Sequence, residues 1–348
     1  MFSNSTQKKH WVFSDESILD KLKYESSQNY IIKFTEKFQG FIESLDDVFL
    51  TLEEEKELQL YYEKKLWDFY TLYFYEIPRS VVDMAFTYYK RFYLVTSVID
   101  FHPKEILVTC LFLACKVDEY NLTLPQFLSN IKGDKKKLAE VIISHEMKII
   151  ERLKFQMIVH TPYRPLEGFF IDIKTRYPLL KDPDKLRIGS GMFLDALLFT
   201  NACFLFTPSQ IALTSLVVSS QKIGEDLTNT GRDCYEIIKI AHFEYAHCGY
   251  IVSSILHICD YIYVELLYEN STLEDKSILQ NSIKKIQELA SSSVFSNSEK
   301  FYAIDKNPNI KIIESKLEKC RNPENNPDAP EFTRKIRIEM GLDDFPDD

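Results

Sequence analysis

Hydrophobic positions along the chain recur every three or four residues, the spacing that places side chains on one face of an α-helix. The segment 51–73 begins with Thr51 and Glu54, which are spaced as a capping box, and continues with apolar positions on one face. Pro78 starts a second such segment with a wide apolar stripe. Pro103 starts a third, PKEILVTCLFLACKV, that is apolar nearly all round. The pattern predicts successive helices, with the Pro103 helix at the centre of the fold.

Two further helices are predicted after these three, and one is predicted before them. Thr123 and Gln126 form a second capping box at the start of a short fourth helix, and residues 134–153 are amphipathic and form a fifth. A helix also begins after Ser14, but its surroundings are polar and short of core residues. We therefore interpret residues 1–44 as an N-terminal arm and helix.

The pattern then repeats. HPKEILVTCL at 102–111 and TPSQIALTSL at 207–216 share proline at the first helical position, isoleucine three residues later and leucine eight residues later. The two prolines are 105 residues apart. A repeat of this length indicates that one helical domain was duplicated. We predict an all-α protein with two five-helix domains, at residues 45–155 and 161–268.

The C-terminal part differs from both copies. Residues 269–320 contain amphipathic segments and are expected to form C-terminal helices. Residues 321–348 are rich in proline, asparagine and aspartate, so we expect a largely disordered tail.

Composition narrows the class of protein. Among 348 residues, 45% are hydrophobic and only 9 are glycine, which favours a globular fold of helices joined by short turns. The formal net charge of −10 argues against nucleic acid as a direct partner. Seven scattered cysteines without a CxxC pair suggest reduced thiols in the cytosol or nucleus. No segment has the apolar length of a signal peptide or a membrane span, so we expect a soluble protein without a membrane partner.

Motifs that would carry catalysis are missing from the sequence. There is no phosphate-binding glycine loop and no G-x-S-x-G nucleophile elbow. His242, His247 and Cys248 are not spaced to share one helical face, so a metal site is not expected there. We expect a protein that is not an enzyme and that uses no cofactor and no metal.

Asp118 and Glu119 raise a question, because they follow the apolar Pro103 helix at its C-terminal end. The helix dipole makes carboxylates unfavourable there, so a nearby cation should compensate them. That cation belongs either to a partner or to the same domain. For Asp118 we expect the second case, with Lys90, Arg91 or another cation of the same domain as its partner.

Several longer runs resemble one family. PRSVVDMAFTYYKRFYL, FLACKVDEYN, HTPYRPLEGFFIDIKTRYP, TPSQIALTSL and SKLEKC, together with NSTQKKHWVFS near the N-terminus, are similar to the cyclin H family of cyclins. The resemblance covers most of residues 1–320. It implies two consecutive five-helix cyclin boxes flanked by N- and C-terminal helices, in agreement with the repeat.

The resemblance also implies a function. Cyclin H proteins are regulatory, non-catalytic subunits of the kinase that activates cyclin-dependent kinases. The expected partners are a cyclin-dependent kinase catalytic subunit, a RING-type assembly factor and the TFIIH core. The expected substrates of the complex are the activation loops of such kinases and the C-terminal repeats of RNA polymerase II, and the expected location is the nucleus.

The resemblance suggests which residues bind these partners. Glu119 matches a glutamate by which cyclins contact the kinase, and Tyr120 lies beside it. Where cyclins typically supply a lysine, the closest alignment gives Phe74, so either an aromatic contact replaces the ion pair or Arg79 supplies the charge. Tyr163, Arg164 and Glu167 are candidates for binding the third subunit, although Arg164 has the alternative role of satisfying buried carbonyl groups.

Other readings remain open. Tyr62 and Lys65 stand where cell-cycle cyclins have methionine and isoleucine in a substrate-docking patch, so we expect no docking of Arg-x-Leu substrates. Alternative functions are another transcriptional cyclin, a helical enzyme with an unrecognised site, or a cyclin-fold general transcription factor that binds DNA. The last predicts a zinc ribbon at the N-terminus, yet residues 1–50 contain no cysteine.

Overall fold

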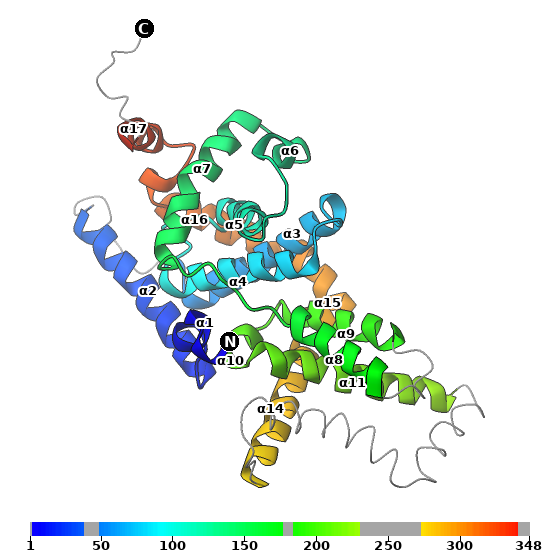
Figure 1. Cartoon of the computed structure of the whole chain (residues 1–348). Coiled ribbons are helices and arrows are strands. Elements are labelled where there is room, and N and C mark those ends of the chain that lie inside the picture. Colours follow the sequence, from blue (N-terminus) through cyan, green and yellow to red (C-terminus); the bar gives the residue numbers. More distant parts are fainter. Residues whose placement is uncertain (1, 38–48, 177–183, 230–272, 340–348) are drawn as a thin grey trace. The chain divides into compact units, whose positions relative to one another are not determined.

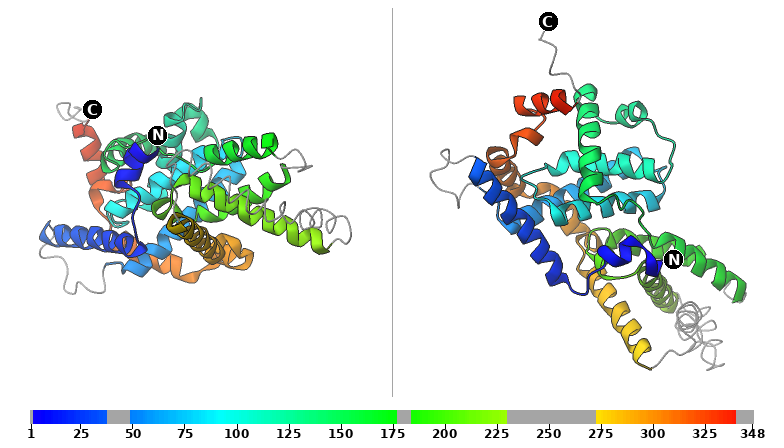
Figure 2. Two further views of the ribbon diagram at one scale, coloured as in Figure 1. Left: turned by 60° about the horizontal axis from the view of Figure 1, so that its bottom comes forward. Right: turned by 60° about the vertical axis from the view of Figure 1, so that its left-hand side comes forward.

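The computed structural model describes residues 2–37, 49–176, 184–229 and 273–339, shown as helices and connecting segments in Figures 1 and 2. The chain divides into two compact units, residues 1–159 with 299–348 and residues 160–298. The regular elements of the described ranges are all helices, which confirms the all-α prediction for this part of the chain.

The central helix of the first unit is α5 (Pro103–Val117), as predicted. Ile106, Thr109 and Leu111 are 0% exposed although they point to different sides of the helix, because α3, α4 and α7 all pack against it. The other helices of this first box are α3 (Leu52–Tyr73), α4 (Arg79–Val95), α6 (Leu124–Ser129) and α7 (Lys135–Arg152).

The corresponding helix of the second unit is α11 (Pro208–Asn229), which starts at the second proline of the repeat. It packs against α8, α9 and α14, and Ala212 is 0% exposed. At its start, the backbone N–H of Thr207 donates to Gln210 Oε1 at 2.9 Å. The last part of the predicted second domain, residues 230–268, lies outside the described residues, and so do the histidines His242 and His247. The other helices of this unit are α8 (Tyr163–Arg176), α9 (Asp184–Leu197), α10 (Ala202–Leu205) and α14 (Leu273–Ser292).

The N-terminal residues form α1 (Thr6–His10) and α2 (Glu16–Lys37), and α2 packs against α3 and α4. Few apolar residues were available for this contact, and a buried polar group helps to make it. The hydroxyls of Ser27 and Ser97 donate to Glu55 Oε1 at 2.6 and 3.2 Å. Burial raises the pKa of the Glu55 carboxyl above its usual value.

The C-terminal residues are more ordered than their composition suggests. Residues 321–339 contain η4 (Pro323–Asn325) and α17 (Pro330–Glu339), so the expectation of a largely disordered tail is wrong for this range. Residues 340–348 lie outside the described part of the chain. Moreover, α14 packs in the second unit, whereas α15 (Ser298–Ala303) and α16 (Pro308–Cys320) pack with the first. The region predicted as C-terminal helices, 269–320, is therefore divided between the units.

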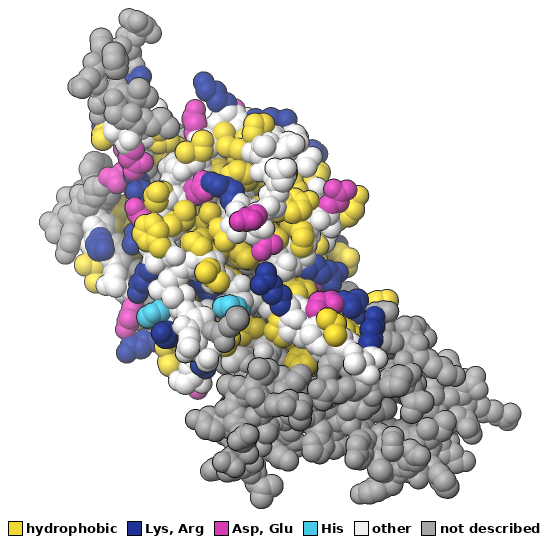
Figure 3. All heavy atoms as spheres, in the orientation of Figure 1, with side chains coloured by type: hydrophobic (Ala, Val, Ile, Leu, Met, Phe, Trp, Pro, Cys, Tyr) yellow, Lys and Arg dark blue, Asp and Glu magenta, His cyan; other side chains and the backbone are white. Residues whose placement is uncertain are grey.

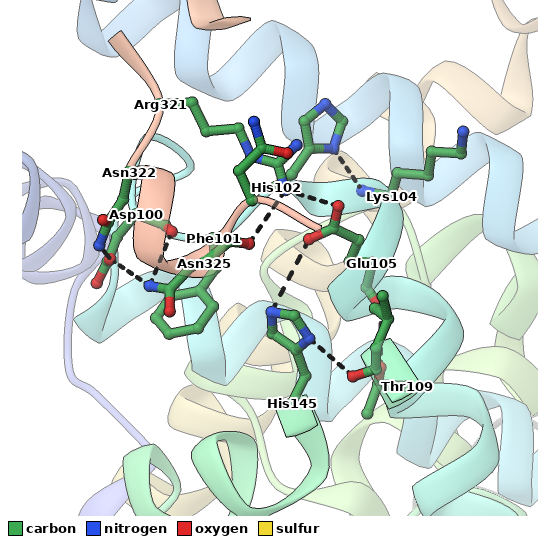
Figure 4. Close-up of polar contacts among 12 residues, drawn as sticks. Asp100, Phe101, His102, Lys104, Glu105, Thr109, His145, Arg321, Asn322 and Asn325 are labelled. Carbon is green, nitrogen blue, oxygen red and sulfur yellow. Dashed lines mark hydrogen bonds and ion pairs between the residues drawn. The ribbon is translucent and has the colours of Figure 1, made fainter. Parts of the chain in front are cut away.

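A C-terminal clamp, which we define as residues 321–325 with Asp100 and Glu105, fastens the tail to the first box (Figure 4). Arg321 Nη2 donates to Glu105 Oε1 at 2.6 Å, and the Arg321 side chain is 3% exposed. The side-chain amides of Asn322 and Asn325 both donate to Asp100 Oδ1 at 2.8 Å. The polar residues of the tail are thus bound to buried groups far away in the sequence.

His145 of α7 lies beside the clamp (Figure 4). Its Nδ1–H donates to the Val141 carbonyl at 2.8 Å, and its Nε2 is 3.8 Å from Glu105 Oε2. On its other side the ring stacks on Phe332 of α17 with a centroid distance of 6.1 Å. Burial lowers the pKa of the His145 imidazole to about 4. The same burial raises the pKa of Glu105 to about 7, although the Arg321 guanidinium opposes this rise.

We predict that Arg321→Met lowers the free energy of unfolding by about 3 kcal/mol, because the buried Glu105 carboxyl group loses both its cation and its hydrogen-bond donor. Urea denaturation at pH 7 measures the change. A matched control is Glu318→Gln, since Glu318 is 55% exposed and lies 3.8 Å from the same guanidinium. The control should change stability by less than about 0.5 kcal/mol. A loss below about 1 kcal/mol for Arg321→Met would contradict the stabilising role of the clamp.

A pH dependence follows from His145. The unfolded chain takes up a proton on this imidazole near its ordinary pKa of about 6.5, whereas the folded chain does so only near pH 4. Stability from this group is therefore complete above pH 6.5 and is lost as the pH falls toward 4. Between pH 7 and pH 5 the parent should lose about 2 kcal/mol more than His145→Leu. Equal losses in urea titrations of the two proteins would rule this out.

Candidate partner-binding surface

The turn at the end of α5 exposes the side chains of Asp118 and Glu119 to solvent. Asp118 closes the helix by donating its N–H to the Ala114 carbonyl, and the Tyr120 N–H donates to the Cys115 carbonyl at 2.8 Å. Between them Glu119 has a φ of 57°, in the left-handed region that favours glycine. A side chain there costs about 1 kcal/mol. Both carboxylates are exposed on this turn.

The expected pairing of Asp118 with Lys90 or Arg91 is wrong. Lys90 Nζ lies 3.1 Å from Glu63 Oε1, and the Arg91 guanidinium lies over the Trp11 ring at 4.9 Å. Within the described ranges, no Lys, Arg or His comes within 4.0 Å of the carboxylate of Asp118 or Glu119. The described part of the chain therefore supplies no cation to offset the unfavourable interaction of these carboxylates with the helix dipole.

Beside this turn, Lys116 of α5 forms an ion pair with Glu146 of α7. The Lys116 ammonium also lies 5.7 Å from the centroid of the Phe112 ring, and its side chain is 47% exposed. We did not identify this pair from the sequence, because its members are 30 residues apart. The one available signal was a lysine at the end of an otherwise apolar helix.

Apolar side chains flank the ion pair on α7. Ile143 and Met147 are each 53% exposed, and their separation of four residues places them on one side of the helix. We call the surface formed by Lys116, Glu119, Ile143, Glu146 and Met147 the α5–α7 face. In Figure 3, hydrophobic side chains gather over the region of α5 and α7, with charged groups among them.

Phe74 does not belong to an accessible surface. It is the C-cap of α3 and is 6% exposed. Its ring stacks on Phe127 of α6 at a centroid distance of 5.1 Å and meets Phe69 edge-on at 5.1 Å. Because this ring is part of the core, the structure does not favour an aromatic contact of Phe74 with the partner, and of the two alternatives for the usual lysine it favours the charge of Arg79, which stays a prediction. Arg79, the first residue of α4, is exposed, and Tyr120 is half-buried.

The face of α3 that carries Tyr62 and Lys65 is covered by the C-terminal residues. The Tyr62 hydroxyl donates to Glu314 Oε1 at 2.7 Å, and Lys65 Nζ lies 2.7 Å from Asp305 Oδ1. The adjacent Lys64, with a side chain 2% exposed, is 2.6 Å from both Asp68 and Asp305. The two positions at which this chain differs from the docking patch of cell-cycle cyclins, Tyr62 and Lys65, are thus bound to residues of the same chain.

In the second unit, the candidates Tyr163, Arg164 and Glu167 all lie near the start of α8. Tyr163 packs partly buried against the core, whereas Arg164 and Glu167 are exposed. The exposure of Arg164 argues against the alternative that it satisfies buried carbonyl groups. Glu167 pairs with Arg187 of α9, whose guanidinium lies 4.5 Å from the Phe170 ring.

Three exposed apolar residues accompany the Glu167–Arg187 pair: Ile171 is 65% exposed, Ile188 71% and Met192 63%. Ile171 follows Glu167 by one helical turn, and Met192 follows Ile188 by one turn. We call Arg164, Glu167, Ile171, Ile188 and Met192 the α8–α9 face. The candidate kinase-binding and third-subunit residues therefore lie in different units.

Among the described residues, no three His, Cys, Asp or Glu side chains are arranged to hold a metal ion. None of the helices in the described ranges is long and apolar enough to cross a membrane.

Comparisons with known proteins agree with this arrangement. The model of the cyclin N-terminal domain matches residues 54–158, and that of the cyclin C-terminal domain matches residues 161–235. Cyclin-H of Xenopus laevis is 41% identical over 244 residues, which cover 68% of this chain and 74% of that protein.

Two solved complexes contain similar chains. One, from Chaetomium thermophilum, is the CAK complex bound to ATP-gamma-S, in which a chain with 20% identity aligns with a TM-score of 0.70 over 100% of this chain and 97% of that one. The other is the yeast TFIIK complex of Kin28, Ccl1 and Tfb3, with 21% identity, a TM-score of 0.56 and coverage of 83% and 99%. The structural likeness supports the cyclin fold, and the identity to the Xenopus protein extends over most of both sequences. The chain therefore belongs to the cyclin family, and within it to the cyclin H group.

Proposed function

We propose that this protein is the regulatory subunit of a cyclin-dependent-kinase-activating kinase and that it binds the kinase through the α5–α7 face. The observation that carries the proposal is Glu119, an exposed carboxylate held in a left-handed turn with no cation near it in the described chain. The exposed Ile143 and Met147 supply apolar area on α7, whose Glu146 pairs with Lys116, three residues before Glu119. A charged group next to apolar side chains is a typical arrangement of a protein interface.

Binding by this face activates the kinase without chemistry on this chain. A kinase subunit exists in inactive and active conformations, and activity requires its conserved lysine and glutamate to be aligned for ATP. A surface that contacts the active conformation more extensively shifts the population toward it. A shift from about 1% to about 99% active requires roughly 5.5 kcal/mol of differential binding. A burial of several apolar side chains and one ion pair is of that order.

The substrates and the location follow from the same proposal. The complex would phosphorylate the activation loops of cyclin-dependent kinases and the C-terminal repeats of RNA polymerase II as part of TFIIH, in the nucleus. The similarity to cyclin H relatives and to chains of the CAK and TFIIK complexes supports this. The net charge of −10 favours protein partners over direct contact with DNA.

A third subunit, a RING-type assembly factor, would bind the α8–α9 face. The yeast TFIIK complex contains three different proteins, which supports a second interface on this chain in addition to the kinase contact. Ile171, Ile188 and Met192 expose apolar side chains around the Glu167–Arg187 pair. Apolar side chains that surround a polar pair suit the docking of a helix or loop from a partner.

We predict that Glu119→Arg weakens kinase binding at least tenfold and lowers kinase activity toward a polymerase-tail peptide, because it places a cation where the partner's cation should lie. The measurement uses purified kinase subunit alone, with the parent chain and with the variant. Glu288→Arg, a charge reversal on an exposed residue of α14, is the matched control and should leave activation unchanged.

Glu119→Gly separates binding from folding. Glycine tolerates the φ of 57°, so the variant should be as stable as the parent, yet it should also lose activation because the carboxylate is missing. If Glu119→Arg and Glu119→Gly both activate fully, Glu119 is not a contact residue. If the parent itself neither binds nor activates the matched kinase, the proposed function is wrong.

The α8–α9 face yields a separate prediction. Ile188→Asp should prevent the assembly factor from joining the complex of kinase and cyclin, because it buries an unpaired carboxylate in an apolar contact. Binding of the kinase alone should be unaffected. Size-exclusion chromatography of the three purified proteins measures assembly, and Ile338→Asp on α17, where Ile338 is 57% exposed, is the control. Full assembly with Ile188→Asp would show that the third subunit does not bind at the α8–α9 face.

A further inference from the structure

Three segments that are distant in the sequence meet at a buried junction in the first unit. Trp11 follows α1 near the N-terminus, Arg91 belongs to α4, and Gln156 lies in the segment after α7. Trp11 is 5% exposed and Arg91 is 1% exposed. A buried tryptophan and a buried arginine next to a connecting segment need a structural or functional explanation.

The contacts at this junction converge on Gln156 and the residue after it. The indole Nε1–H of Trp11 donates to Gln156 Oε1 at 2.7 Å. The guanidinium of Arg91 lies 4.9 Å from the Trp11 ring, and its Nη1 donates to the Gln156 carbonyl at 3.4 Å. The hydroxyl of Tyr88 donates to the Met157 carbonyl at 2.5 Å. Hydrogen bonds therefore fix both the side chain of Gln156 and the backbone carbonyls of Gln156 and Met157.

The segment held in this way is strained. Directly before Gln156, Lys154 has a φ of 55° and Phe155 a φ of 59°. Both are in the left-handed region, and neither is glycine or asparagine, the residues that adopt it most readily. Consecutive residues of this kind persist only where the surroundings fix them, and such strain is concentrated at functional sites.

The strained turn presents apolar side chains to solvent. Phe155 is 68% exposed and Ile158 is 69% exposed, although Leu153, immediately before the turn, is 0% exposed. Phe155 remains next to the end of α7, since its N–H donates to the Ile150 carbonyl at 2.9 Å. The turn thus adds exposed apolar side chains at the end of the helix that carries Ile143 and Met147.

We propose that Trp11 and Arg91 are positioning residues that act through Gln156: they hold the left-handed turn so that Phe155 contacts the kinase as an extension of the α5–α7 face. The inference rests on the proposed kinase binding. It gives the N-terminal residues around Trp11 a part in partner binding although they need not touch the partner. A change at Trp11 should therefore affect the kinase contact only through the turn.

The test is a double-mutant cycle with the full chain and the purified kinase subunit, in which the Kd of each pair is measured. Trp11→Phe removes the indole N–H but keeps an aromatic ring for Arg91. It should weaken binding about fivefold in the parent and less than twofold in a Phe155→Ala background, because residues that act through one another are not additive. Thermal unfolding of each variant is recorded alongside.

A rescue variant distinguishes positioning from stability alone. Lys154→Asn favours the left-handed conformation locally, so it should restore most of the binding lost in Trp11→Phe. A purely stabilising role of Trp11 would give the same loss with and without Phe155, and no rescue. Either of those results overturns the proposal, as does unchanged binding of Trp11→Phe.

The same binding measurements distinguish a failure of the proposed function from a failure of the role proposed for the turn. If the parent chain does not bind the kinase, the kinase-activating function is wrong. If the parent binds and Phe155→Ala binds equally well, kinase binding stands and only the role of the turn is refuted.

Discussion

The complete burial of one helix organises the first unit. Because α5 is apolar nearly all round, α3, α4 and α7 must enclose it, and charged groups are confined to its two ends. At the N-terminal end, Glu105 is sealed under the C-terminal residues by Arg321. At the C-terminal end, Lys116 and Glu119 remain at the surface. One end of the helix therefore serves the internal structure of the protein, and the other is the end at which we propose that the kinase binds.

The two ends also differ in how their charges are balanced. Glu105 has a cation at 2.6 Å, whereas Glu119 has none in the described chain and lies at the negative end of the helix dipole. A carboxylate in this position is locally unfavourable in the free protein. A partner that brings a cation removes this cost when it binds, so the same feature that slightly destabilises the isolated chain adds to the affinity of the complex.

Local features of the fold could be predicted from the sequence, and long-range features could not. The capping box of Thr51 and Glu54, the central position of α5 and the matching start of α11 follow from neighbouring residues, and the structure contains all three.

The long-range contacts depend on tertiary packing. The Lys116–Glu146 pair joins residues 30 apart, and the Arg321–Glu105 contact joins residues 216 apart. Composition suggested disorder for the tail because it is rich in proline, asparagine and aspartate, yet Asn322 and Asn325 both donate hydrogen bonds to Asp100. The burial of Phe74 could not be predicted for the same reason, since it depends on Phe127 from another helix.

The first unit is discontinuous, and this has a consequence for how the protein is made. Residues 299–339 complete a unit that begins at the N-terminus, with the whole second unit between them. As the chain leaves the ribosome, α3 and α5 emerge long before the residues that cover Lys64 and Glu105. Until synthesis is finished, buried charges of the first box face water, and the box cannot reach its final structure. A messenger RNA truncated late in its coding region would therefore damage the earliest part of the protein rather than only its end.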